Sequence, residues 1–199
     1  KLWLRRADLF RDLDEGVFAQ SALNNPLRDA FPGLHLESND AEVRRNQEID
    51  RMCRFIHCWY AGETASELMW AKYGDQSRGI CLRSSTAKIM AAVKALKHVS
   101  GGIHAVTYCD ENNPAMELHS ALPYCRKRRQ FEGENEIRLL ATLELSHPLL
   151  HGSALPGNAW PDHINLDVDL QAMLSGIILG PSMGGGDAVR MADLVNTRL

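Results

Sequence analysis

The clearest alternation of polar and apolar positions lies in residues 134–145. The odd-numbered positions from Ile137 to Leu145 are apolar, whereas Glu134, Glu136 and Arg138 occupy even-numbered positions. Side chains two positions apart stand on the same face of a strand, so this pattern is typical of a strand with an apolar inner face and a polar outer face. We predict a strand over residues 134–145 whose three charged side chains project together from the sheet.

Shorter patterns predict the other elements. Residues 55–60, 79–82, 103–108 and 175–181 are short apolar runs that are typical of strands. Thr64 and Glu67 have the spacing of a capping box, which predicts a short helix that ends at Gly74. Residues 84–86 are suited to cap a second helix, and the glycines at 184–186 precede a third. Short strands interrupted by helices favour an α+β fold: a single domain with a mixed or antiparallel sheet and flanking helices.

Composition limits the classes of protein that the chain can represent. The 199 residues are 45% hydrophobic and 24% charged, which is typical of one globular domain. No apolar run reaches the roughly 20 residues that a membrane span needs, so we expect no membrane partner. Five cysteines form no regular framework, and we expect reduced thiols and a cytoplasmic location. The net charge of -3 excludes a broad basic field for nucleic acid.

The densest group of charged residues is the segment from Arg126 to Arg138. Its four consecutive cations, residues 126–129, are the local site at which we expect phosphate or nucleic acid to bind. Lys127, Arg129 and Arg138 are therefore candidate site residues. Paired carboxylates raise the pKa of one member and a neighbouring guanidinium lowers it, so Glu134 or Glu136 could be poised for acid, base or charge-stabilising chemistry. The alternative interpretation is a solvated strand face with ion pairs across the sheet.

Two further clusters have a structural interpretation beside a functional one. Trp59, Trp70 and Tyr73 could stack on a ligand, although such aromatic residues more often fill a core. Cys53, His57 and Cys58 suggest a metal or a thiol nucleophile, but no second pair follows at ligand spacing. We therefore predict no metal site.

Motifs along most of the chain resemble those of an uncharacterised bacterial family, domain of unknown function twenty-nine seventy-one. The most specific part is a Phe-x-x-Glu-x-Glu-x-Arg segment, residues 131–138. The other parts are residues 6–16, 57–59, 69–73, 79–85, Tyr108, 127–128 and 177–181. Members of that family usually begin with a further strand. The resemblance thus implies that residues 1–199 form a single domain that lacks an N-terminal strand.

The order of these motifs is also similar to that of ADP-ribosyltransferases, which implies a related fold, NAD as cofactor, and transfer of ADP-ribose or hydrolysis of NAD. On this resemblance Glu136 is the catalytic carboxylate and Glu134 activates the acceptor. Arg5, Arg6 or the missing N-terminal strand would contact the pyrophosphate, although neither arginine lies in an obvious strand. The residues expected to line the NAD pocket are His57, Trp70, Tyr73, Arg83 and Ser84.

Two other classes stay open. In the first, the chain is a non-catalytic module of a phage-defence or toxin system, residues 126–129 bind nucleic acid or phosphate, and the carboxylates form a structural lattice with Arg138. In the second, it is a metal-dependent nuclease that adds Asp12, Asp14 or Glu15 to the two glutamates. The sequence indicates neither the acceptor nor the oligomeric state.

Overall fold

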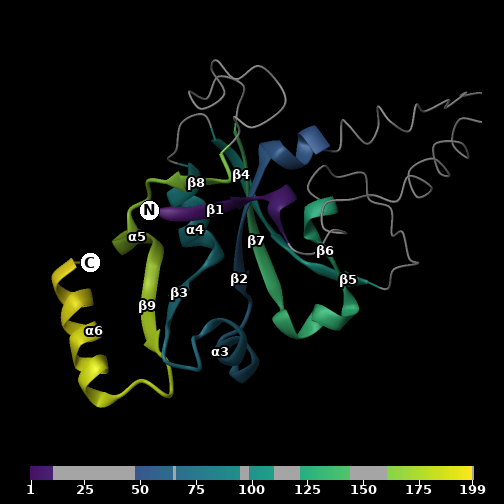
Figure 1. The fold of residues 1–199 in the computed structure, drawn as a ribbon. Helices are drawn as coiled ribbons and strands as arrows, with labels where there is room; N and C mark the ends of the chain where they lie inside the picture. The colour runs from purple at the N-terminus through teal and green to yellow at the C-terminus, as the bar shows by residue number, and fades with distance from the viewer. Residues whose placement is uncertain (11–47, 65, 95–98, 110–121, 144–160, 199) are drawn as a thin grey trace, which may run out of the picture.

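The central element of the fold is a five-stranded sheet with the strand order β4-β7-β2-β1-β8. In the computed structural model, residues 1–10, 48–64, 66–94, 99–109, 122–143 and 161–198 are described. All neighbouring strands of this sheet are antiparallel (Figure 1). The strands are β1 (Leu2–Arg6), β2 (Arg54–Tyr60), β4 (Val99–Ala105), β7 (Glu136–Leu143) and β8 (His163–Leu166).

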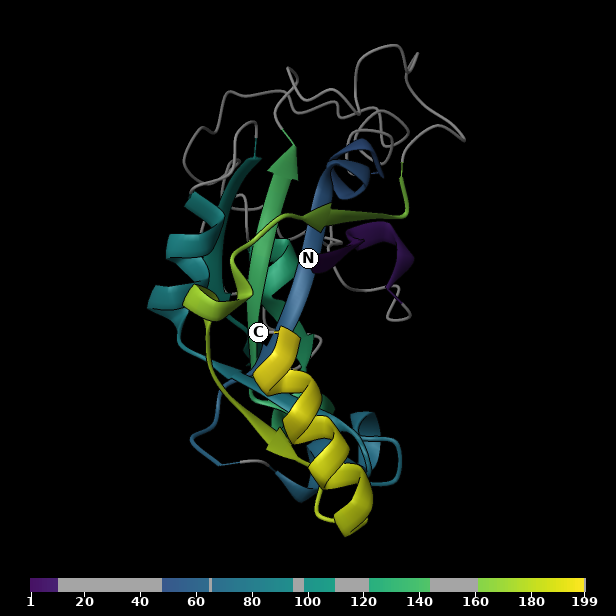
Figure 2. The ribbon, with the colours of Figure 1, turned by 90° about the vertical axis from the view of Figure 1, so that its left-hand side faces the viewer.

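Two small sheets and several helices flank these strands. β3 (Ile80–Ser84) pairs with β9 (Leu174–Leu179) in antiparallel fashion, and β5 (Thr107–Cys109) runs parallel to β6 (Arg126–Arg128). In Figure 1 the β3–β9 pair lies on one side of the central strands and the β5–β6 pair on the other. The helices are α3 (Glu67–Tyr73), α4 (Thr86–Lys94), α5 (Leu170–Met173) and α6 (Gly185–Arg198), and the 3-10 turns are η1 (Ala7–Leu9), η2 (Leu122–Cys125) and η3 (Arg129–Glu134). The last helix, α6, lies at the outer edge beside β9 in Figure 1, and it faces the viewer in the turned view of Figure 2.

Apolar side chains cover both faces of the middle of the sheet. On one face Leu139 and Ala141 of β7 belong to the main core, which α4 and α5 complete with Ile89, Val93 and Met173. On the other face Leu140 belongs to a second cluster, whose further members are Ala7, Ile56, Tyr124 and Cys125. Each buried apolar side chain contributes about 1.5–3 kcal/mol to folding, so both layers stabilise the central strands.

The structure confirms the predicted α+β class and a strand at each of the five predicted places. Three details of the prediction were wrong. The run 103–108 is split between two strands of different sheets, because Val106 leaves β4 and donates to the Glu136 carbonyl at 2.9 Å. α3 begins after Ser66, with no side-chain cap, so the capping box at Thr64 does not form. Strands β1 and β8 were not predicted at all, and β1 contains Arg5 and Arg6.

The polar side of β7 also differs from its prediction. We predicted that Glu134, Glu136 and Arg138 would project together from one strand, and the alternative interpretation was a solvated strand face. Only 5%, 8% and 0% of their surfaces are exposed, so the face is not solvated. Glu134 lies at the end of η3, outside the strand, which begins at Glu136. The burial follows from η2 and β6, which pack over this face of the sheet.

The turn between α3 and β3 has an unusual backbone. Asp75, Gln76 and Ser77 have φ angles of 45°, 56° and 67°, in the left-handed region. The carbonyl oxygen of Ser77 accepts a hydrogen bond from the Ser182 N–H at 3.0 Å, and Gly180 donates to the carbonyl of Gly79 at 2.9 Å. The turn is thereby fixed against the chain that follows β9.

Several expectations concern residues that lie outside the described ranges. These are Asp12, Asp14 and Glu15, and the end of the predicted strand at 144–145. Among the residues that are described, no helix is long and apolar enough to cross a bilayer. All five cysteines lie in the described residues, and none of them forms a disulfide there.

Candidate functional site

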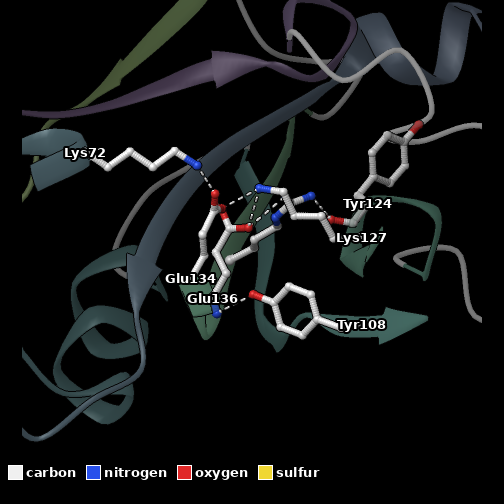
Figure 3. Close-up of polar contacts among 7 residues, drawn as sticks. Lys72, Tyr108, Tyr124, Lys127, Glu134 and Glu136 are labelled. Atoms are coloured by element: carbon white, nitrogen blue, oxygen red, sulfur yellow. Dashed lines mark hydrogen bonds and ion pairs between the residues drawn. The ribbon is translucent and has the colours of Figure 1, made fainter. Parts of the chain in front are cut away.

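A cluster of charged side chains surrounds the start of β7. The Nζ atom of Lys127 lies 2.7 Å from Oε2 of Glu134 and 3.3 Å from Oε2 of Glu136. Arg138 lies two positions after Glu136 in β7, so its side chain is on the same face of the strand. Its guanidinium donates a hydrogen bond of 2.9 Å to the same Oε2 atom of Glu136. The structure thus brings together four residues that the sequence singled out. Figure 3 shows Lys72 and Lys127 reaching the carboxylate of Glu134 from opposite sides.

The backbone at Asn135 explains how two glutamates from different elements meet at one lysine. Asn135 has a φ of 38°, a left-handed conformation that asparagine tolerates better than most residues. Its N–H donates to the Glu132 carbonyl at 3.0 Å, and its side-chain amide donates to the carbonyl of Ala61. This bend ends η3 and starts β7, so that the side chains on either side of Asn135 converge on Lys127.

Arg138 is the most deeply buried charged residue that the structure describes, with an exposed fraction of 0%. It stands opposite Cys58 in the β2–β7 register and donates through Nη1 to the Tyr124 carbonyl at 2.6 Å. A buried charge is costly unless it is paired and hydrogen-bonded, and Glu136 supplies that partner. Arg138 therefore serves at least to anchor η2 to the sheet.

Both carboxylates have lowered pKa values. Burial by itself raises the pKa of Glu136, but the positive charge of Arg138 and a hydrogen bond from Cys58 outweigh it. Burial likewise acts to raise the pKa of Glu134, and hydrogen bonds from Lys127 and Lys72 hold the pKa below its usual value. Both groups are consequently ionised at neutral pH. The sequence analysis allowed for a raised pKa of one of the two glutamates. The surrounding cations instead lower the pKa of both Glu134 and Glu136.

Lys72 is a member of the site that the sequence analysis missed. Its ammonium group, on α3, contacts Oε1 of Glu134, and its side chain keeps 42% of its surface exposed. The hydrogen bond to Glu134 raises the pKa of Lys72. The signal in the sequence was only its place between Trp70 and Tyr73, because nothing local indicates that this side chain reaches a carboxylate 62 positions away.

The ring of Phe131 lies at the centre of the positive charges. Nζ of Lys127 is 5.0 Å from the ring centroid, Nζ of Lys72 is 5.5 Å away, and Cζ of Arg128 is also 5.5 Å away. The negative face of an aromatic ring attracts cations at such distances, by about 0.5–1 kcal/mol each at exposed sites. Phe131 thus helps to keep three cationic groups close together.

Two tyrosines that the sequence analysis gave no role hold the cluster in place. The hydroxyl of Tyr108 accepts a hydrogen bond from the Glu136 N–H at 2.8 Å, and burial raises the pKa of this hydroxyl. The hydroxyl of Tyr124 donates to Oδ2 of Asp50 at 2.6 Å. Burial is the largest cause of a strongly raised pKa of Tyr124, and the hydrogen bond to Asp50 is the second. A tyrosine hydroxyl that is buried usually finds such a partner, but sequence alone does not say which.

The residues expected to line an NAD pocket are only partly brought together. Tyr73 is 63% exposed and lies beside the cluster, with its ring centroid 5.4 Å from Nζ of Lys72. Trp70 is buried in α3, where its ring packs against Gly74. Arg129, the further candidate from the basic run, is exposed at the start of η3.

The remaining three residues of that set lie elsewhere. His57 pairs in register with Leu139, on the face of the sheet opposite to Glu136 and Arg138, and its Nδ1 is 2.7 Å from the Trp3 carbonyl. Arg83 and Ser84 belong to β3, and the hydroxyl of Ser84 donates to the Met173 carbonyl at 2.6 Å. Among the described contacts, no hydrogen bond or ion pair joins these three residues to Glu134 or Glu136.

The site can therefore offer two ionised carboxylates, several cationic groups and one exposed aromatic ring. It is suited to bind an anion or to stabilise a positive charge. In the part of the chain that the structure describes, no three His, Cys, Asp or Glu residues are grouped so as to hold a metal ion.

Residues 69–139 match the model of a family described as "Protein of unknown function (DUF2971)". This match confirms the resemblance to that family over a segment that runs from α3 to the first half of β7, and it includes every member of the charged cluster. Neither the curated proteins nor the solved structures contained a match to this chain.

Proposed function

We propose that this chain, with its DUF2971 segment at residues 69–139, binds a phosphate-bearing nucleotide at the surface formed by α3, β6 and η3, and that NAD is the first ligand to test. The observation that carries the proposal is the arrangement around Phe131. Three cationic groups lie 5.0, 5.5 and 5.5 Å from its ring, and one of them, Lys72, is exposed next to the exposed ring of Tyr73.

The two exposed groups suit the two parts of a nucleotide. A lysine ammonium is a compact point charge that binds phosphate oxygens, and a tyrosine ring stacks on a base or on nicotinamide. In the described structure Lys72 and Tyr73 are adjacent in α3, with 5.4 Å between the ammonium and the ring centroid. A base on Tyr73 would thus place its phosphates within reach of Lys72.

A nucleotide fits this surface better than nucleic acid does. The net charge of the chain is -3, and the cations lie around one ring rather than along a stripe that could follow a phosphate backbone. Proteins that bind nucleic acid generally present several phosphate contacts in a row. Binding of an RNA or DNA oligonucleotide is therefore the competing outcome in the test.

The proposal is tested by titrating the protein with NAD, ATP and pyrophosphate in a calorimeter. We expect Lys72→Gln to weaken binding of the ligands about tenfold, since it removes a charged hydrogen bond. Tyr73→Ala should weaken binding of NAD more than binding of pyrophosphate, because pyrophosphate has no base to stack on the ring. The matched control is Lys88→Gln, an exposed lysine on α4 that donates to the Leu174 carbonyl. Failure of all three ligands to bind, or tighter and strongly salt-dependent binding of single-stranded RNA, would reject the proposal.

A second candidate function, cleavage of the nicotinamide–ribose bond of NAD, has one observation in its favour. Glu136 is ionised, with Arg138 at 2.9 Å and Lys127 at 3.3 Å holding its carboxylate in one position. Bond cleavage develops an oxocarbenium ion, which a fixed carboxylate stabilises. Glu134, with its lowered pKa, would be a weak base for an acceptor, so water is the simplest acceptor.

This second candidate has its own assay. Wild-type protein is incubated with NAD, and free nicotinamide and ADP-ribose are measured. Glu136→Gln should stop their release and change the dissociation constant of NAD little. If wild-type protein binds NAD but releases no nicotinamide with water or with added protein acceptors, the chain is a binding module and the catalytic role of Glu136 fails.

A further inference from the structure

The carboxylate of Glu134 is an anion that the two lysines of the site, Lys72 and Lys127, already bind. Its two oxygens are divided between them: Oε1 contacts Lys72, and Oε2 lies 2.7 Å from Lys127. Only 5% of Glu134 is exposed, and the left-handed Asn135 that follows it fixes the backbone. The carboxylate is therefore a fixed internal anion rather than a mobile surface group.

The two lysines differ in what else can reach them. Lys127 has 11% of its side-chain surface exposed and contacts Glu136 as well as Glu134. Lys72 has 42% exposed, and the one carboxylate among its described ion pairs is that of Glu134. An anion that arrives from solvent can thus contact Lys72 first, and it must share or displace the bond that Lys72 makes with Glu134.

We propose that Glu134 is an internal competitor of the ligand's phosphate for Lys72, and thereby sets how tightly this surface binds phosphate. The inference rests on the proposed nucleotide-binding function and deepens it. It assigns Glu134 a role other than activation of an acceptor: the carboxylate keeps Lys72 charged and positioned while the surface is empty, and it opposes binding of a second anion.

The competition has a distinctive consequence for substitutions. Glu134→Gln keeps the shape of the side chain and removes its charge, so the ammonium of Lys72 becomes available to the phosphate. A structural role alone predicts that this variant binds as wild type or more weakly. Competition predicts tighter binding, and it predicts that the gain depends on Lys72.

The experiment compares the dissociation constants of pyrophosphate and NAD for the full chain and four variants. We expect Glu134→Gln to tighten binding about tenfold, as expected when one close charge opposes a ligand. Lys72→Gln should weaken binding, and the double variant should bind like Lys72→Gln. The matched control is Glu132→Gln, an exposed glutamate in the same 3-10 turn, for which we expect a change of less than about twofold, since exposed charges are screened by salt.

Each outcome decides between the two proposals. The inference is overturned if Glu134→Gln binds no tighter than wild type, if the double variant keeps the gain, or if Glu132→Gln gains as much. It is also overturned if Glu134→Gln fails to unfold cooperatively, because the carboxylate is then required for the fold. If wild type binds neither ligand, the proposed function fails, and the inference that rests on it fails too. If wild type binds and Glu134→Gln binds no tighter, the inference alone fails.

Discussion

Nη1 of Arg138 donates a hydrogen bond of 2.6 Å to the backbone carbonyl of Tyr124. This contact joins the strand that carries the candidate site to the 3-10 turn η2 that covers it. The same guanidinium pairs with Glu136, so one buried side chain supports both the cover and the carboxylate.

Replacing Arg138 with alanine should therefore destabilise the fold severely. The variant leaves the buried Glu136 without its arginine partner, and breaking one side of such a pair costs about 3–5 kcal/mol. Urea denaturation followed by circular dichroism measures the change. The matched control is Arg190→Ala on α6, whose 3.9 Å pair with Asp187 is exposed, and which should change stability by less than about 0.5 kcal/mol.

Gly180 should not tolerate a side chain. A Cβ atom at this position would clash with the backbone carbonyl of Ser77 and would lie 2.9 Å from that of Gly79. Backbone atoms cannot rotate away as side chains do, so we expect Gly180→Ala to lower the midpoint of thermal unfolding clearly. A Cβ atom at Gly176, in β9 itself, would meet nothing within 4 Å, so Gly176→Ala should unfold close to wild type. Equal midpoints for the two variants would contradict the described packing of this turn.

The left-handed turn before β3 offers a stabilising substitution. Gln76 has a φ of 56°, which costs a residue with a side chain about 1–2 kcal/mol but costs glycine little. Gln76→Gly should therefore stabilise the protein by about 1 kcal/mol after the greater chain entropy of glycine is offset. Gln76→Ala keeps the Cβ atom and removes the same contact with Arg78, so it isolates the backbone effect. The comparison fails if alanine stabilises as much as glycine.

His57 should make stability depend on pH on the acid side of neutrality. Burial lowers the pKa of His57 in the folded state, although the Trp3 carbonyl partly opposes this. The unfolded chain takes up the proton near the usual value of about 6.5, so the contribution to stability is complete above that pH and is lost as the pH falls below it. We expect the unfolding midpoint of wild type to fall between about pH 7.5 and 5.5, and that of His57→Gln to fall less. Parallel pH profiles would contradict this account.

Local patterns predicted the middle of the fold and part of the site. The alternation in residues 136–143 reports a strand directly, and the sheet register shows that Leu139 and Ala141 face one core, as their parity predicted. The same alternation gave a wrong prediction for the even-numbered positions, whose charged side chains it placed on a polar outer face. Glu136 and Arg138 are charged yet buried, because η2 and β6 cover them, and a cover from distant sequence leaves no periodic signal.

The missed members of the site have the same physical cause. Lys72 and Tyr108 reach the glutamates across 62 and 28 positions of sequence, through contacts that only the folded chain creates. The opposite error concerns His57, which lies one strand away from Glu136 but on the other face of the sheet. Membership of the same motif does not determine on which face of the sheet two side chains lie. The face follows only from the pairing register of the strands.

The position of β1 has a consequence for how the chain folds during synthesis. Residues Leu2–Arg5 pair with β8, where Leu2 lies opposite Leu166, whereas the register of β1 with β2 extends over Arg5 and Arg6 only. β1 is thus synthesised well before β8, and most of its backbone is paired only once β8 has been made. Such long-range closure is slow compared with local pairing. The nascent chain therefore carries β1 without most of its backbone partners until β8 is made, and chaperone binding or aggregation at residues 2–6 is the vulnerability that this strand order creates.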